Sequence, residues 1–159
     1  MLIVKGFVYR ILNIAHPQAS WHYIKDKEME SRIETLLQAA KIAKEHAYAP
    51  YSHFHVGAAL ITPAGKIYSG CNVENASYGL TICAERNAIF KMVCDGEQQI
   101  EEMLILGDTD EFLPPCGACR QVIAEFSRKK SIIYMCNKYE QWKKVTVGEI
   151  LPYTFFLNK

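Results

Sequence analysis

One segment of the chain has the apolar spacing of an amphipathic helix. Between about residue 27 and residue 48, apolar side chains recur every three or four positions: Ile33, Leu36, Leu37, Ala40 and Ala43. Polar residues such as Glu34 and Lys41 fall between them. The spacing predicts a helix that buries one face. We expect it to end before Pro50, because proline disfavours a helical residue in front of it.

The rest of the chain alternates between short apolar runs and turn residues. Runs rich in β-branched and small apolar residues predict strands at 54–62, 67–73, 103–106, 131–136 and 143–147. Helical spacing predicts two further helices, at 82–94 and 116–128. The inward residues of the first are Ala88, Ile89, Met92 and Val93. This order of elements predicts an α/β fold in which helices pack on a central sheet.

The first 28 residues show no period that decides between helix and strand. Their apolar residues fit either element: Leu2, Ile3, Val4, Phe7, Val8, Ile11, Leu12 and Ile14. Pro17 interrupts whatever structure precedes it. We interpret His16 and His22 as polar linker residues and not as metal ligands.

Composition narrows the classes of function. The chain has 159 residues, of which 50% are hydrophobic, enough for one core and one domain. A net charge of +1 gives no electrostatic footprint for nucleic acid or an anionic membrane. We expect neither a membrane span nor a secretory signal, since no apolar run is long enough. Six cysteines in such a chain favour metal or redox chemistry over disulfides, which predicts a cytoplasmic enzyme.

Three of the cysteines fall in two short windows that each open a predicted helix. Cys83 lies in Cys-Ala-Glu-Arg, and Cys116 and Cys119 lie in Pro-Cys-Gly-Ala-Cys-Arg. Thiolates suit a tetrahedral zinc ion, and three protein ligands leave the fourth position open for water. The partial positive charge of a helix N-terminus favours the thiolate form. A structural site would close with a fourth Cys or His, so the neighbouring Glu85 indicates a catalytic metal with a carboxyl that carries protons.

Two points about these windows have alternatives. Cys116 and Cys119 could form a redox pair, although the Cys-x-Glu upstream argues against it. A guanidinium from Arg86 or Arg120 could donate to the ligand sulfurs and offset the negative charge of zinc with three thiolates. The alternative is a solvated surface arginine, which fits Arg120 equally well and Arg86 less well.

Together with two upstream segments, these windows resemble the short, homotetrameric cytidine deaminases. The matching segments are 50–60 (PYSHFHVGAAL), 70–78 (GCNVENASY), 83–86 (CAER) and 115–121 (PCGACRQ). Cys83 stands where the general base-deaminase pattern shows His, which is the variant with three cysteines. The resemblance covers roughly residues 31 to 155. It implies a three-layer α/β/α domain with a mixed central sheet of about five strands.

The resemblance implies a zinc-dependent hydrolysis. Cys83, Cys116 and Cys119 would hold one zinc ion per subunit, and Glu85 would take a proton from the zinc-bound water. The hydroxide would attack C4 of cytosine while Glu85 protonates N3 and then the leaving ammonia. Cytidine and 2′-deoxycytidine would become uridine and 2′-deoxyuridine, a step of pyrimidine salvage. Helix geometry alone does not bring Glu85 to the metal, because positions i and i+2 point apart.

The same resemblance implies a substrate site that subunits share. Phe54 would pack on the base, and the Ala84 amide would bind the base carbonyl. Asn72 and Glu74 would bind the ribose 3′-hydroxyl. Two residues would be lent to the site of a neighbouring subunit in the homotetramer: Tyr78 and Phe155.

Most of these residues also have a purely structural interpretation. Phe54 could belong to a strand core, Asn72 could cap a strand end, and Phe155 could anchor the C-terminal tail. For Glu74 the sequence offers no other obvious partner.

Two features depart from the family pattern. Asn87 stands where many members have Thr, and residues 1–28 have no counterpart. We therefore divide the chain into an N-terminal extension, 1–28, and a deaminase domain, 29–159. Met29 could itself start a chain of ordinary length for the family, so the extension is either genuine or the product of an upstream start.

Three other functions are considered. A blasticidin-type antibiotic deaminase would share zinc and Glu85 but differ in the sugar pocket, and Asn72-Val73-Glu74-Asn75 favours cytidine. A zinc-stabilised binding module would leave Glu85 without a role. A polynucleotide deaminase is disfavoured by the neutral charge and by the lack of a basic, aromatic groove.

Overall fold

The computed structural model describes the backbone of residues 17–157 and the side chains of residues 29–157. The chain divides into two units, Met1–Arg32 and Ile33–Lys159. The second unit contains the sheet and every candidate site residue. Residues 1–16 of the predicted extension, which include its listed apolar residues and His16, lie outside the described residues, as do the side chains of residues 17–28. The backbone of His22 belongs to a helix, so its prediction as a linker residue is wrong.

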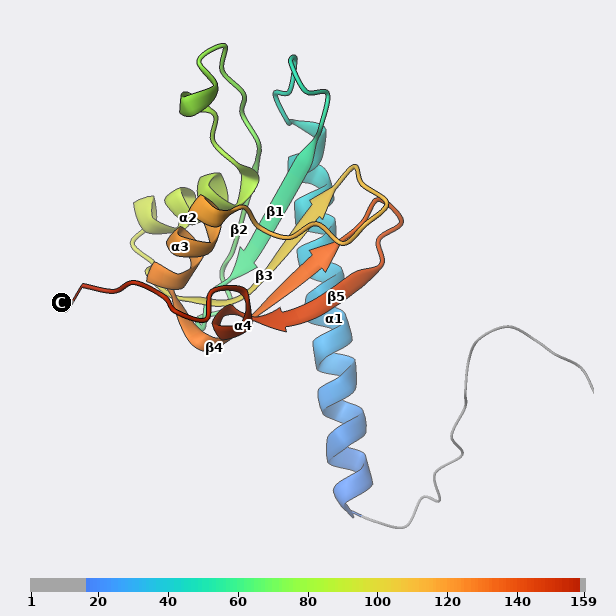
Figure 1. Ribbon diagram of the computed structural model, residues 1–159. Helices are drawn as coiled ribbons and strands as arrows, with labels where there is room; N and C mark the ends of the chain where they lie inside the picture. The colour runs from blue at the N-terminus through green and yellow to red at the C-terminus, as the bar shows by residue number, and fades with distance from the viewer. Residues whose placement is uncertain (1–16, 158–159) are drawn as a thin grey trace, which may run out of the picture. The chain divides into compact units, whose positions relative to one another are not determined.

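A five-stranded mixed sheet forms the centre of the second unit (Figure 1). Its strands are β1 (Val56–Ile61), β2 (Ile67–Cys71), β3 (Ile100–Gly107), β4 (Ser127–Cys136) and β5 (Trp142–Thr146). They lie in the order β2-β1-β3-β4-β5. The pair β3–β4 is parallel and the other neighbours are antiparallel. The predicted mixed sheet of about five strands is confirmed.

Helices α1 (Pro17–Glu45), α2 (Ala84–Cys94) and α3 (Gly117–Glu125) agree with the predicted helices except at their ends. The predicted start of α1 near Lys27 is wrong, because the helix already begins at Pro17. Proline suits the first position of a helix, where its missing N–H would have no partner. The sequence analysis did not predict the 3₁₀ turn η1 (Tyr78–Leu80) or the short helix α4 (Val147–Ile150).

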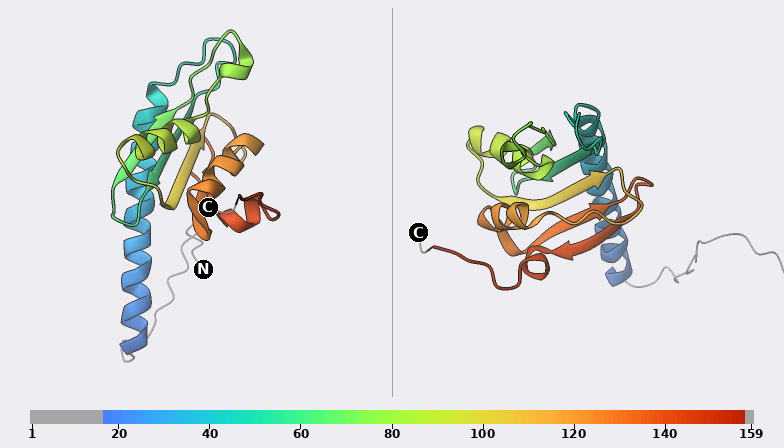
Figure 2. Two further views of the ribbon diagram at one scale, coloured as in Figure 1. Left: turned by 90° about the vertical axis from the view of Figure 1, so that its left-hand side faces the viewer. Right: turned by 45° about the horizontal axis from the view of Figure 1, so that its top comes forward.

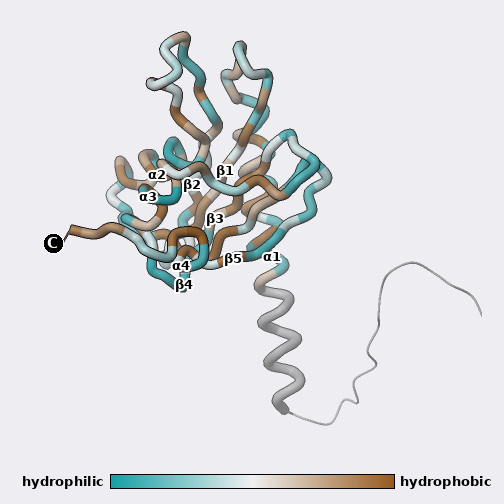
Figure 3. Tube along the Cα trace, in the orientation of Figure 1, coloured by the Kyte–Doolittle hydropathy of each residue, from teal (hydrophilic) through white to brown (hydrophobic). Residues whose placement is uncertain are grey.

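The strands bury both faces of the sheet, so three layers result. On one face, α2 and α3 pack against residues that alternate along the strands: Val56, Ala58, Leu60, Met103, Ile105, Ile133 and Met135. The part of α1 from Ile33 onward runs across the opposite face (Figures 1 and 2). Apolar segments concentrate in the central strands (Figure 3). Of the inward residues predicted for α2, Ala88, Ile89 and Met92 are buried, but Val93 is 36% exposed and that prediction is wrong.

Candidate active site

Two helix N-termini meet at one side of the sheet and bring the three thiols together. Cys83 is the N-cap of α2 and Cys116 is the N-cap of α3. Cys119 lies in the first turn of α3, and its backbone N–H donates to Cys116 Sγ at 3.5 Å. The three Sγ atoms lie within 4.8 Å of one another. Among the residues described, they form the one group of this kind that could hold a metal ion.

The spacing of the thiols fits a tetrahedral zinc site. Zn–S bonds of about 2.3 Å at the tetrahedral angle place sulfurs about 3.8 Å apart. Cys83 Sγ and Cys116 Sγ are 3.9 Å apart. None of the cysteines forms a disulfide. The donor set therefore fits one zinc ion per chain, with three protein ligands.

One thiolate is already stabilised at this centre. A hydrogen bond from the Cys119 thiol, together with Arg86, lowers the pKa of Cys83 to about 5. The same pairing, followed by burial, raises the pKa of Cys119. Arg86 Nη2 donates to Cys83 Sγ at 3.5 Å and to the Thr81 carbonyl at 3.1 Å. Arg120 contacts no sulfur in the described interactions: its Nε donates to the Pro115 carbonyl at 2.8 Å.

Glu85 lies in the first turn of α2, beside the thiols, and is only 4% exposed. Burial raises the pKa of its carboxyl above the ordinary value. A carboxyl with a raised pKa can both accept and return a proton near neutral pH.

Cys83, Cys116 and Glu85 open into a cavity of about 200 Å³. Besides Cys83, Cys116 and Glu85, its walls are formed by Phe54, Val56, Asn72, Thr81, Ala84, Leu113 and Pro114. A second opening, of about 390 Å³, shares Thr81 with it. Its other residues are Tyr51, Ser52, Glu74 and Tyr78. The first cavity is smaller than the roughly 300 to 1,000 Å³ of drug-sized ligand pockets, so it suits one flat ring better than a whole nucleoside.

Comparison with known proteins decides the family. A model of the cytidine and deoxycytidylate deaminase zinc-binding region matches residues 30–136. The cytidine deaminase of Sporosarcina psychrophila is 46% identical over 123 residues, which are 77% of this chain and 90% of that protein. The chain belongs to the cytidine deaminase family.

Further relatives agree in sequence and in structure. The cytidine deaminase of Halalkalibacterium halodurans is 45% identical over 77% of this chain and 92% of its own length. A crystal structure of cytidine deaminase from Burkholderia pseudomallei superposes with a TM-score of 0.74 at 44% identity, covering 77% of this chain and 98% of that one. The Mycobacterium tuberculosis enzyme gives a TM-score of 0.68 at 35% identity, covering 78% and 97%.

Within the deaminase fold, two of the residues expected at the sugar make structural hydrogen bonds. Asn72 accepts from Val56 N and donates to the Phe54 carbonyl, each at 2.8 Å. Glu74 accepts from the backbone N–H groups of Tyr51 at 2.9 Å and Ser52 at 3.2 Å, and also from the Ser52 hydroxyl. The expectation that Glu74 has no other partner is therefore wrong.

Tyr78 and Phe155 do not line the cavity of their own chain. Tyr78 is 76% exposed and meets Tyr51 edge-on, with ring centroids 6.1 Å apart. Phe155 is 68% exposed, and its carbonyl accepts from Gln121 Nε2 at 3.0 Å.

Sequence reasoning missed several residues of this deaminase site. Val56, Thr81, Leu113 and Pro114 line the cavity but carry no recognisable chemistry. For Leu113 and Pro114, the adjacency to Cys116 was an available signal. Asn87, the departure from the family pattern, donates to the Cys71 carbonyl at 2.8 Å and so ties α2 to the end of β2.

Within the described chain, no helix combines the length and the apolar character that a membrane span requires.

Proposed function

We propose that this protein hydrolyses cytidine and 2′-deoxycytidine to uridine and 2′-deoxyuridine, with release of ammonia. The observation that carries the proposal is the position of the buried Glu85 beside three thiols that converge within 4.8 Å, in a cavity that Glu85, Cys83 and Cys116 line. A zinc-stabilised binding module would need a fourth ligand, and the described cluster supplies only three.

Cys83, Cys116 and Cys119 would hold the zinc ion. When bound, the ion supplies a Lewis acid that makes water nucleophilic at neutral pH. Arg86 donates to the Cys83 sulfur and so offsets part of the negative charge of the three thiolates.

Glu85 would move the protons of the reaction. Its carboxylate takes a proton from the attacking water and gives it to N3 of the base as a bond forms at C4. The carboxylate then takes the second proton, from the hydroxyl now bonded to C4, and gives it to the exocyclic nitrogen; the C4–N bond breaks, the C4 carbonyl forms, and ammonia leaves. Burial from water favours this role, because it raises the pKa of Glu85 toward the working pH.

The remaining walls would orient the nucleoside. Phe54 packs against one face of the base, and the Ala84 N–H at the start of α2 binds its carbonyl, since the first N–H groups of a helix have no intrahelical partner. Asn72 and Glu74 would bind the ribose. Glu74 lies in the adjoining opening, which shares Thr81 with the first cavity.

We also propose a homotetramer with sites completed across subunits. Its support is the exposed apolar tail, in which Tyr153 is 98% and Leu157 is 74% exposed, together with exposed Tyr78 and Phe155. The free thiols suit a reducing compartment, so we place the enzyme in the cytoplasm. Light scattering on the active protein tests the assembly, and a fully active monomer would contradict it.

The test of the activity is loss of the ultraviolet absorbance of cytidine, with ammonia release, measured before and after zinc removal by a chelator. Glu85→Gln should keep zinc and fold but lose turnover by at least about 10²-fold, because general acid–base catalysis contributes roughly 10² to 10⁴. Blasticidin S serves as the competing substrate. Near-normal cytidine turnover by a zinc-replete Glu85→Gln protein would refute the assignment.

A further inference from the structure

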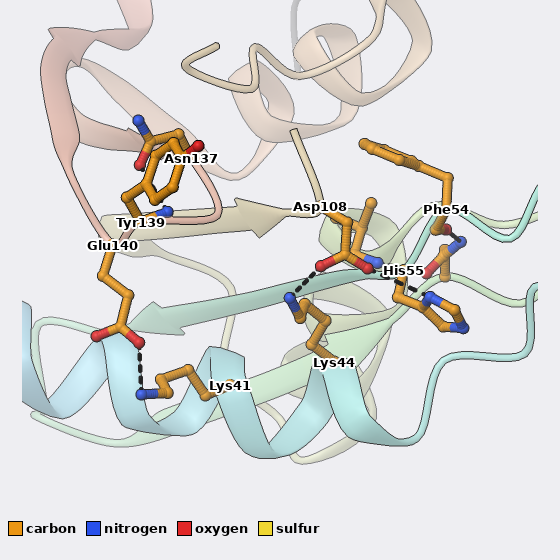
Figure 4. Close-up of polar contacts among 10 residues, drawn as sticks. Lys41, Lys44, Phe54, His55, Asp108, Asn137, Tyr139 and Glu140 are labelled. Carbon is orange, nitrogen blue, oxygen red and sulfur yellow. Dashed lines mark hydrogen bonds and ion pairs between the residues drawn. The ribbon is translucent and has the colours of Figure 1, made fainter. Parts of the chain in front are cut away.

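A polar cluster outside the metal centre lies next to the wall of the cavity. Asp108 follows directly after β3 and contacts two basic side chains through its two carboxylate oxygens (Figure 4). Lys44 Nζ of α1 contacts Oδ1, and His55 Nδ1 lies 3.3 Å from Oδ2. Burial is the largest single influence on Asp108 and opposes its ionisation, but the hydrogen bonds and charges of Lys44 and His55 together outweigh burial and hold the pKa of this carboxyl below its ordinary value. Asp108 is therefore charged at neutral pH and joins three segments of the chain.

The first segment that it joins carries Phe54. His55 is the next residue in the chain, so its contact with Asp108 fixes the backbone on the C-terminal side of Phe54. On the other side, Phe54 N donates to Ser52 Oγ at 3.0 Å, and the Phe54 carbonyl accepts from Asn72 Nδ2 at 2.8 Å. The backbone of Phe54 is thus held at consecutive positions, and its ring forms part of the cavity wall.

The second segment leads from β3 to the metal ligands. Asp108 begins this connection, which carries Leu113 and Pro114 of the cavity wall and ends at Cys116. Gly107, one residue earlier, supports both parts of the wall. A Cβ at this position would lie 2.5 Å from Leu113 Cδ2 and 3.2 Å from Phe54 Cζ, so the end of β3 is the surface on which these side chains rest.

We propose that Asp108 is a positioning residue that sets the width of the base-binding cavity. It holds Phe54 through His55 and holds Leu113 through the connection that it begins, while Lys44 anchors it to α1. The inference rests on the proposed function, because it assumes that the cavity receives the base. An asparagine could not replace the carboxylate, since its amide nitrogen would face either Lys44 or the N–H of His55 and would leave one contact without an acceptor.

The chain offers a matched control on the same helix. Lys41 lies one turn before Lys44 and pairs with Glu140 at 2.6 Å (Figure 4). The two pairs are similarly exposed: 38% and 43% for the Lys41 and Glu140 side chains, 23% and 38% for Lys44 and Asp108. Glu140 lies in the connection between β4 and β5, and neither Lys41 nor Glu140 lines the cavity.

The experiment compares Asp108→Asn, His55→Ala, His55→Gln and Glu140→Gln in the full-length, zinc-loaded protein. We expect Asp108→Asn and His55→Ala to raise the KM for cytidine about threefold to tenfold, with zinc content unchanged and kcat within about twofold. The double variant Asp108→Asn/His55→Ala should have a KM no higher than that of the worse single variant, because both changes break the same contact. His55→Gln keeps a hydrogen-bond donor for Asp108, so its KM should lie close to that of wild type. Glu140→Gln should leave KM unchanged.

Each outcome bears on one claim. If wild-type protein fails to deaminate cytidine, the proposed function fails and this inference fails with it. If wild type is active and Asp108→Asn has the same KM, only the inference fails. An equal rise of KM in Glu140→Gln would also overturn it, because the effect would then reflect general loosening of α1 and not the cavity wall.

Discussion

Replacing Gly70 by alanine would test how closely the position of α2 controls the reaction. Gly70 lies in β2 directly beneath α2, and a Cβ there would lie 2.6 Å from Ala88 N and 2.9 Å from the Ala84 carbonyl oxygen. Both are backbone atoms, so no side-chain rotation relieves the clash. Ordinary van der Waals contact begins at 3.4 Å, and the helix would have to retreat by about 0.8 Å.

This shift of α2 would displace Cys83 and Glu85, because both residues lie at its N-terminus. A misplacement of about 1 Å can cost on the order of 10²-fold in rate. Overpacking of this kind costs about 1 to 3 kcal/mol of stability. We therefore expect Gly70→Ala to fold, to melt at a lower temperature, and to lose between tenfold and about 10²-fold in kcat.

The assay is kcat at saturating cytidine, measured beside zinc content and Tm. Gly148→Ala in α4 is the control, since its Cβ would lie 3.3 Å from the Lys129 carbonyl oxygen and requires only a slight adjustment. If Gly70→Ala melted several degrees lower but kept wild-type kcat, the helix position would not control the reaction and this reasoning would be refuted.

Three further changes have expected outcomes. Exchanging both Cys116 and Cys119 for serine should abolish zinc binding and lower Tm together, because the site links two helix starts. Zinc content is measured by elemental analysis, with Cys94→Ser as the control. Stoichiometric zinc in the double serine protein would rule the site out. Hydrogen bonds from Tyr68 and Lys66 lower the pKa of Asp95 below 3.8, so its stabilisation is complete at neutral pH and is lost as the pH falls through the folded-state pKa. The difference in urea midpoint between wild type and Asp95→Asn should therefore be present at pH 7 and shrink below about pH 4. A protein beginning at Met29 should keep its cytidine turnover per site; an assembled, zinc-loaded but inactive truncation would place the extension in the active site.

The layered fold could be predicted because apolar residues recur along each helix and strand with the spacing typical of that element. Strand residues alternate between the two faces of the sheet, and buried residues of α2 recur at helical spacing. Val93 misled the prediction because it is apolar and adjacent to Met92, yet it lies about 100° further around the helix. The short helix α4 had an available signal: Thr146 and Glu149 form a capping box, and both hydrogen bonds are present.

Contacts across long sequence separations could not be predicted. Lys44 and Asp108 are 64 residues apart, and Glu74 and Ser52 are 22 apart. The local sequence around each of these four residues does not predict its partner, because the pairing depends on which segments the fold brings side by side. This is why Glu74 seemed to lack a partner and why Asp108 drew no attention.

The meeting of Cys83 and Glu85 follows from the conformation of a single residue. Positions i and i+2 diverge only when both are helical. Cys83 is the N-cap of α2, with φ −72° and ψ 157°, so its backbone is extended and its side chain does not follow the helical period. Glu85 is inside the first turn, and both side chains reach the same cavity. N-caps ordinarily take Ser, Thr, Asp or Asn, whose oxygens accept the first N–H groups of the helix. A cysteine at the N-caps of both α2 and α3 is therefore unusual for helix capping and fits ligation, because it turns two thiols out of their helices toward one ion.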